Sequence, residues 1–159
     1  MAAAYREAFE AHDYAAIRDL LAPDAVLFSP ITPSFQFHGQ AQVADVLRDV
    51  NEVTDQLEIT DLIGSGDTHA LISQGSVGGE SIGGVVVLRV EDERIRELTV
   101  YIRPLPGLAT LTAKLGPPVA RRRGRLHALL IWVMTAPLAF VLRVGDKLLA
   151  GLARPPGQP

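Results

Sequence analysis

Hydrophobic residues follow a helical period in the first third of the chain and a strand period after it. In three stretches they recur every three or four residues, which predicts three helices. The predicted buried faces carry Tyr5, Ala8 and Phe9, then Ile17, Leu20 and Leu21, then Val43, Val46, Leu47, Val50 and Val53. From Leu57 onward, four β-rich runs are separated by turn sequences at 64–67, 78–79 and 91–93. The pattern therefore predicts an α+β domain of three helices followed by a four-stranded meander.

The segments between these elements carry their own local signals. Asp13 is placed to cap the second helix. Pro23-Asp24 predicts a turn, and Val26–Phe28 then has strand character before prolines break it into an irregular loop at 30–33. We therefore expect one early strand, available to pair with the meander.

The end of the domain is marked by a change in composition. Prolines and glycines follow the last β-rich run, with a short helix predicted at Leu108–Leu115. We place the domain at residues 1–118 and a basic, hydrophobic helical tail at residues 119–159.

The tail has two interpretations that the sequence leaves open. An arginine cluster at 121–125 precedes an apolar run at Leu126–Leu142. As a helix this run would be about 25 Å long, against a hydrocarbon thickness of about 30 Å, and Pro137 interrupts it. Residues 121–153 therefore predict contact with a membrane surface, or packing against the acidic body or a dimer partner.

Charge divides the chain more sharply than its net value of −3 suggests. Residues 1–103 hold 7 basic and 17 acidic side chains, a balance of −10, whereas residues 104–159 hold 8 and 1, a balance of +7. The N-terminus lacks the apolar run of a secretory signal, and the chain has no cysteine, which fits a reducing compartment. We expect a cytoplasmic protein; the membrane interpretation of the tail would place it on, or anchor it in, the inner face of the membrane.

Several classes of function have no support in the motifs. The glycine-rich stretches match neither a dinucleotide-binding fingerprint nor a P-loop, so they are interpreted as hairpins. The four histidines lack metal-ligand spacing, and we expect neither a metal nor a cofactor. The arginine cluster comes without an aromatic-rich sheet or recognition helix, and the body is acidic, so no nucleic-acid partner is expected.

The order of elements, with the segments YREAFEAHDYAAIRDLLAPDAVLFSP, FHGQAQVADVL and IRELTVYIRP, resembles the nuclear transport factor 2-like superfamily, and within it the SnoaL-like group. The resemblance covers residues 2–115. It implies a cone-shaped domain, in which three N-terminal helices pack on a strongly curved, mostly antiparallel sheet and leave an apolar cavity. It also implies a homodimer formed through the outer face of the sheet.

Aligned with ketosteroid isomerase, which it resembles, the chain has a matching residue at one of that enzyme's three functional positions. Tyr5 falls at the oxyanion-stabilising tyrosine, but Ser29 falls at the proton-shuttling aspartate, and Val86 falls near the protonated aspartic acid. Isomerase chemistry of that type needs a carboxylate base, which this chain lacks at the matching position.

The charged group of an epoxide hydrolase of this superfamily has no counterpart either. The expected inward positions of the last two strands are all uncharged: Gly84, Val86, Leu88, Val90, Leu98, Val100 and Ile102. The outward positions are expected to be Arg89, Glu97, Tyr101 and Arg103.

Tyr5, Ser29 and His38 are the catalytic candidates that remain. Each also has a structural interpretation: Tyr5 as a helix-packing residue, Ser29 as a turn residue before Pro30, and His38 as a solvent-exposed or capping residue. The expected ligand-binding residues are Phe9, Phe28, Phe35, Phe37, Val86, Leu88, Leu98, Val100 and Ile102.

The leading hypothesis is that the domain binds a small hydrophobic molecule, with or without transforming it. One alternative is a metal-independent SnoaL-like enzyme, a cyclase, isomerase or hydrolase acting on a polyketide-, steroid- or terpene-like substrate. Another is a non-catalytic, dimeric assembly module in which the cavity is a filled core.

Overall fold

Four helices and six strands make up the described part of the chain, which comprises residues 1–34, 36–121, 137, 141–142 and 144–145 in this computed structural model. The helices are α1 (Ala2–Glu10), α2 (Tyr14–Leu20), α3 (Gln40–Val53) and α4 (Leu105–Arg121). The strands are β1 (Leu21–Phe28), β2 (Phe37–His38), β3 (Asp55–Ser65), β4 (Thr68–Val77), β5 (Glu80–Glu91) and β6 (Arg94–Arg103). The three predicted N-terminal helices are confirmed, and Asp13 caps α2 by accepting a hydrogen bond from the Ala16 N–H at 2.9 Å.

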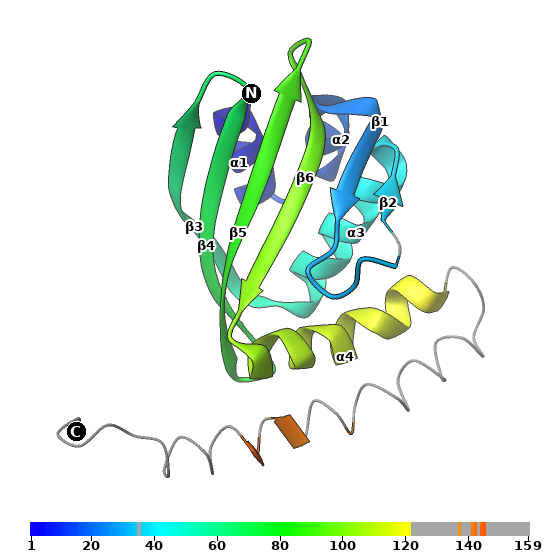
Figure 1. The fold of residues 1–159 in the computed structure, drawn as a ribbon, viewed down its shortest axis with the longest axis vertical. Coiled ribbons are helices and arrows are strands. Elements are labelled where there is room, and N and C mark those ends of the chain that lie inside the picture. Colours follow the sequence, from blue (N-terminus) through cyan, green and yellow to red (C-terminus); the bar gives the residue numbers. More distant parts are fainter. Residues whose placement is uncertain (35, 122–136, 138–140, 143, 146–159) are drawn as a thin grey trace, which may run out of the picture.

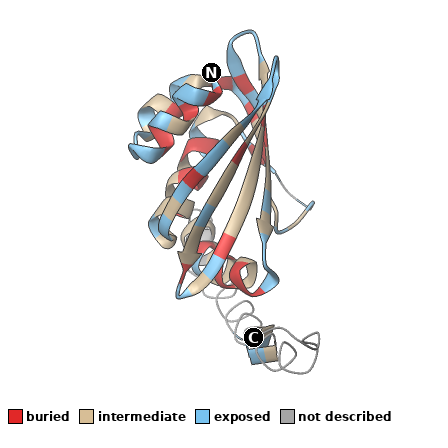
Figure 2. Cartoon of the chain, turned by 90° about the vertical axis from the view of Figure 1, so that its left-hand side faces the viewer, coloured by how far each residue is buried: buried red, intermediate tan, exposed pale blue. Residues whose placement is uncertain are grey.

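The strands form one curved sheet in the order β2-β1-β6-β5-β4-β3. Only β1 and β6 run parallel; the other neighbours are antiparallel, as predicted. Helices α1, α2 and α3 cover one face of this sheet, and α4 lies across one end of the space between sheet and helices (Figure 1). The side view in Figure 2 shows the buried residues gathered between the two layers. The predicted α+β architecture is therefore confirmed.

Tight turns and bulges give the sheet its shape. Gly78 and Gly79, and also Asp92 and Glu93, have positive φ at both turn positions, the geometry that joins antiparallel strands with their natural twist. The pairing register shifts twice between β3 and β4, and once between β5 and β6. Such bulges increase the local bend and twist of a strand, which helps the sheet to curve over the helices.

The predicted turn at Pro23-Asp24 is wrong, because both residues lie inside β1. Leu21 pairs with Ile95 and Val26 pairs with Glu97, with a register shift between these two pairs. The irregular stretch accommodates a proline that has no N–H to donate to the ladder. The flanking apolar side chains are buried in the core, which holds the chain in this path.

Helix α4 is longer than predicted at both ends. The carbonyl of Pro104 accepts a hydrogen bond from the Leu108 N–H at 3.0 Å, and Pro106 occupies the first turn, where its missing N–H costs no bond. A Cβ added at Gly107 would lie 2.5 Å from a methyl group of Ile82 and 2.7 Å from the Ser81 carbonyl oxygen. Glycine at this position therefore lets α4 pack directly on β5. The helix continues past the domain boundary predicted at residue 118.

The outer face of the sheet carries exposed hydrophobic side chains, and the homodimer stays a prediction. Ile63 and Tyr101, on this face, are 58% and 59% exposed.

Light scattering after gel filtration is expected to give a particle with twice the mass of one chain. The double variant Ile63→Glu/Tyr101→Glu is expected to have half that mass, because the charged side chains would separate the two copies. Leu105→Glu, a change at an equally exposed leucine of α4, should leave it unchanged. A monomeric parent protein would contradict the prediction.

Most of the predicted tail lies outside the described residues. Within the described residues, no helix combines the length and the apolar content needed to cross a bilayer. Contact between the tail and a membrane surface stays a prediction.

Candidate functional site

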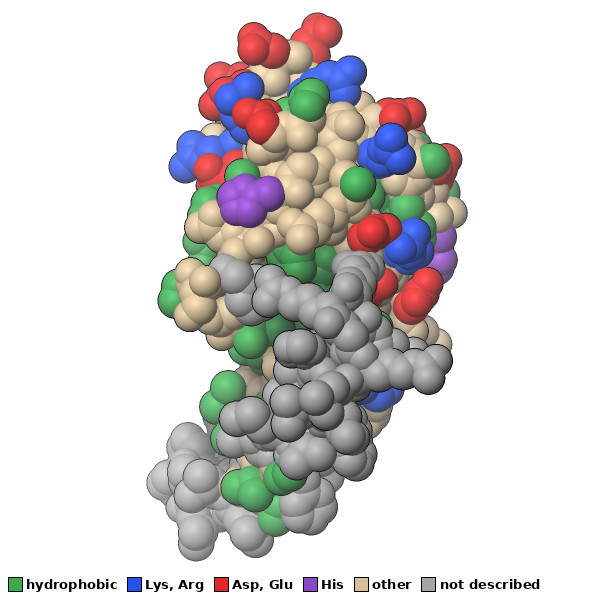
Figure 3. Space-filling view, turned by 90° about the vertical axis from the view of Figure 1, so that its right-hand side faces the viewer, with side chains coloured by type: hydrophobic (Ala, Val, Ile, Leu, Met, Phe, Trp, Pro, Cys, Tyr) green, Lys and Arg blue, Asp and Glu red, His purple; other side chains and the backbone are tan. Residues whose placement is uncertain are grey.

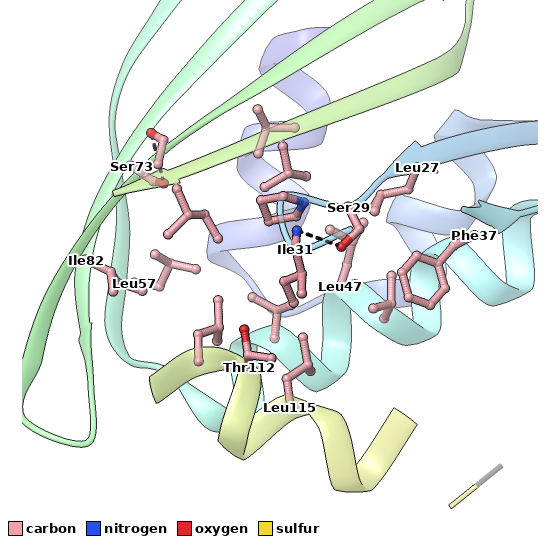
Figure 4. Close-up of a pocket in the computed structure, with 18 of the residues that line it drawn as sticks. Leu27, Ser29, Ile31, Phe37, Leu47, Leu57, Ser73, Ile82, Thr112 and Leu115 are labelled. Carbon is pink, nitrogen blue, oxygen red and sulfur yellow. Dashed lines mark hydrogen bonds between the residues drawn. The ribbon is translucent and has the colours of Figure 1, made fainter. Parts of the chain in front are cut away.

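An apolar cavity of about 360 Å³ lies between the sheet and the helices. Its volume falls within the range of typical small-molecule sites. The side chains in Figure 4 converge on it from the sheet, from α3, from α4 and from the loop after β1. The lining comprises Tyr5, Phe9, Leu27, Ser29, Pro30, Ile31, Thr32, Phe37, Val46, Leu47, Val50, Leu57, Ile59, Leu71, Ser73, Ile82, Gly83, Gly84, Val86, Val100, Ile102, Leu111, Thr112, Leu115, Gly116 and Val119.

Helix α4 closes one side of the cavity with a single stripe of residues. Leu111, Leu115 and Val119 recur every four residues and line the cavity together with Thr112 and Gly116. Residues at this spacing lie on the same face of a helix. Because Gly107 brings the start of α4 close to β5, this stripe faces the inner surface of the sheet.

Polar side chains in the lining are few, and most already make hydrogen bonds. The Ser29 hydroxyl accepts a bond from the Ile31 N–H at 3.2 Å, and the Thr32 hydroxyl accepts one from the Ser34 N–H at 3.1 Å. These bonds shape the loop after β1. On the walls, the hydroxyls of Ser73 and Thr112 donate to backbone carbonyls, at 3.4 Å and 2.8 Å respectively.

Tyr5 differs from these four residues. Its side chain is 2% exposed and stacks against Phe9 with the ring centroids 6.1 Å apart. Within the described residues its hydroxyl has no hydrogen-bond partner. Burial raises the pKa of Tyr5, with a smaller contribution from Tyr14, so the hydroxyl keeps its proton at neutral pH. Tyr5, one of the lining residues, therefore carries a neutral hydrogen-bond donor whose bonding capacity is unused by the described protein.

Charged side chains are absent from the described lining. The part of the chain that the structure describes also contains no cluster of histidine, aspartate or glutamate that could hold a metal ion. The described lining can therefore hold an apolar molecule and donate hydrogen bonds to it, but it offers no carboxylate or imidazole as a proton-transfer group.

The structure brings seven of the predicted site residues to the cavity: Tyr5, Phe9, Ser29, Phe37, Val86, Val100 and Ile102. Their predicted functions are not tested by this placement. Leu88 and Leu98 have the predicted inward orientation, but they are fully buried in the core and do not line the cavity.

Two other predicted residues lie elsewhere. Phe28 is half-buried and has the opposite orientation to Leu27, which does line the cavity. His38 is exposed on β2, where its backbone N–H donates to the Gln42 side chain at 2.6 Å. The structure does not bring it to the cavity. Phe35 lies outside the described residues.

The predicted list omitted residues from α3, α4, β3 and β4. The helical spacing of Val43, Val46, Leu47 and Val50 indicated a buried face, but only Val46, Leu47 and Val50 line the cavity. Leu111 and Leu115 stood four residues apart in the predicted short helix, which was a usable signal. Nothing in the sequence showed against which element that helix packs.

Solved structures share this fold. A protein from Silicibacter pomeroyi with a cystatin-like fold has 26% identity and a TM-score of 0.70, over 79% of this chain and 92% of that chain. A steroid delta-isomerase from Pseudomonas aeruginosa has 27% identity and a TM-score of 0.70, over 76% and 90%. A putative ketosteroid isomerase from Kribbella flavida has 26% identity and a TM-score of 0.56, over 65% and 75%.

Curated proteins give no match to this chain. A family comparison, in contrast, matches the SnoaL-like domain over residues 2–98, which is more than half of the chain. This match includes the first three helices and the sheet as far as the middle of β6, and it agrees with the resemblance seen in the sequence. The chain belongs to the SnoaL-like domain family, within the nuclear transport factor 2-like superfamily.

Proposed function

We propose that this protein binds a small, largely apolar molecule that accepts a hydrogen bond from Tyr5. The observation that carries the proposal is an apolar cavity of about 360 Å³ lined by a buried tyrosine whose hydroxyl has no partner in the described chain. A buried donor without a partner is costly, and a ligand acceptor would remove that cost. The surrounding apolar side chains favour a hydrophobic ligand body.

The neutral dye prodan is a suitable probe, because it joins an apolar naphthalene to one ketone acceptor. Tyr5→Phe is expected to weaken prodan binding by about 2-fold to about 10-fold, the value of one neutral hydrogen bond. Binding of 2-dimethylaminonaphthalene, which lacks the ketone, should not change. Both affinities are measured by fluorescence titration of purified protein without detergent.

Tyr14→Phe is the matched control. The Tyr14 hydroxyl accepts a hydrogen bond from the Asn51 side chain at 2.8 Å and lies outside the cavity lining, so its loss should leave both affinities unchanged. Since Tyr5 keeps its proton, prodan affinity should also be constant at pH values below the ordinary tyrosine pKa of about 10. Failure of the parent protein to bind either dye would contradict the proposed function.

A second candidate function is catalysis on a molecule of the same class. The observation in its favour is that Tyr5 and Ser29, two of the predicted catalytic residues, line one cavity. A neutral donor such as Tyr5 stabilises negative charge that develops on a ketone oxygen. Conversion of a β,γ-unsaturated ketosteroid to its conjugated isomer, followed by ultraviolet absorbance, tests this candidate. Turnover that Tyr5→Phe abolishes would favour it over binding alone.

A further inference from the structure

The rim of the cavity lies in the loop after β1. Ile31 is 42% exposed, whereas every other lining residue is buried or half-buried. Its loop is held by the Ser29 and Thr32 hydroxyls described above, and Figure 4 shows Ile31 between the sheet and α4. A hydrophobic side chain is therefore presented to the outside at the edge of an apolar cavity.

Basic residues occur in α4 and directly after it in the sequence, next to the residues that line the cavity. The charged residues of α4 are Lys114 and Arg121, both basic. Arg121 follows the lining residue Val119 by two positions, a rise of about 3 Å along a helix. The sequence continues Arg122-Arg123-Gly124-Arg125.

The remainder of the domain has the opposite charge. Residues 1–103 carry a balance of −10. In Figure 3, charged side chains of both signs crowd the upper part of the body, and hydrophobic side chains are visible below them. An anionic surface would therefore attract the end of the molecule that carries the cavity rim and repel the rest.

We propose that this rim docks on an anionic phospholipid bilayer, and that the cavity exchanges its apolar ligand directly with the lipid. This inference rests on the proposed function, because an apolar ligand of the cavity would concentrate in hydrocarbon rather than in water. The arginine cluster supplies the attraction to anionic headgroups. Ile31 supplies an apolar contact with the interface, at the edge of the cavity that the ligand enters.

Docking is tested with vesicles of phosphatidylcholine alone and of phosphatidylcholine mixed equally with phosphatidylglycerol. Protein binding is measured by co-sedimentation, with the emission of Trp132, the single tryptophan, as a second readout. The variant Arg122→Gln/Arg123→Gln/Arg125→Gln leaves α4 unchanged. It is expected to weaken binding to the anionic vesicles roughly 100-fold, because the attraction of three basic residues to the anionic headgroups is lost.

The matched control carries the same change in charge elsewhere. Arg18→Gln/Arg48→Gln/Arg89→Gln removes three arginines of α2, α3 and β5, none of which lines the cavity. It should bind the anionic vesicles within about threefold of the parent protein, because its arginine cluster is intact. Equal losses in the two triple variants would overturn the docking proposal, because net charge alone would then account for binding.

Ligand exchange is tested by transfer of prodan from anionic vesicles that contain a nitroxide-labelled quencher lipid. Ile31→Ser is expected to slow transfer to the protein several-fold, whereas Ile63→Ser, at an exposed isoleucine of the outer sheet face, should not. Prodan affinity without vesicles should be unchanged in both triple variants.

Two further results separate this inference from the function on which it rests. One result is a protein that binds prodan in solution but binds vesicles with and without phosphatidylglycerol equally well. It would overturn the inference and leave the proposed function standing. Vesicle binding by a protein that takes up no prodan would contradict the proposed function, and the exchange step would fail with it.

Discussion

Tryptophan in place of Val100 is expected to weaken prodan binding at least about 100-fold, a loss of roughly 3 kcal/mol. Val100 lies in β6 opposite Val86, and both side chains line the cavity. An indole at this position would fill the space that the ligand needs. Because the cavity can accept part of the larger side chain, the cost of overpacking should stay within about 1–3 kcal/mol. Isothermal titration calorimetry gives the affinity, and thermal melting shows whether the variant is folded.

Tyr101→Trp is the control for this change. It exchanges one aromatic ring for another at the adjacent position of β6, on the opposite face of the sheet, where Tyr101 is 59% exposed. Its affinity for prodan should match that of the parent protein. A folded Val100→Trp variant with unchanged affinity would show that prodan binds outside this cavity.

Leu88→Ala is expected to lower the free energy of unfolding by about 2–5 kcal/mol. Leu88 is fully buried in β5, where it pairs with His69 of β4 and Leu98 of β6. Removing its side chain loses apolar burial and leaves a void that the surrounding sheet cannot fill. Since small domains are stable by only about 5–15 kcal/mol, much of the total would be lost. Denaturation by urea, followed by circular dichroism, measures the change.

The same substitution at an exposed leucine provides the comparison. Leu105 is 58% exposed at the start of α4, so Leu105→Ala should change stability by no more than about 0.5 kcal/mol. Similar effects at the two positions would contradict the assignment of Leu88 to the core.

The location of the cavity connects these predictions to function. Fully buried residues such as Leu88 and Leu98 fill the core inside the sheet, and Val86 and Val100, each two positions away in the same strand, line the cavity. One sheet therefore provides both a packed core and one side of the apolar cavity. Substitutions at the core positions should therefore lower the free energy of unfolding, whereas substitutions at the cavity positions should mainly lower the affinity for prodan.

Much of the fold was predictable because it depends on local patterns. The period of hydrophobic residues identified α1, α2 and α3, and the turn sequences separated β3 to β6. Alternation along β5 and β6 placed Val86, Val100 and Ile102 inward and Tyr101 outward, as observed. The turn at Pro23-Asp24 was predicted incorrectly, because local propensity favoured a turn and burial of the flanking residues in the core favoured a strand.

The candidate site was less predictable than the fold. Tyr5 and Ser29 were selected through the family resemblance, and both line the cavity. His38 was selected as well, but it follows the inward-facing Phe37 in β2 and is exposed. The α4 stripe was missed, because the prediction ended its helix at Leu115 and gave it no partner.

The sequence by itself determined the order of the elements, the two faces of the last strands, and the division between an acidic body and a basic end. The order of the elements and the two faces of the strands follow from backbone geometry, which acts over a few residues. The division of charge follows from composition, which requires no contact between residues. Only the tertiary structure decided that Tyr5 has no hydrogen-bond partner in the described chain, that α4 closes the cavity, and that Ile31 forms its rim. Each of these depends on contacts between segments far apart in the sequence, and no local period encodes such contacts.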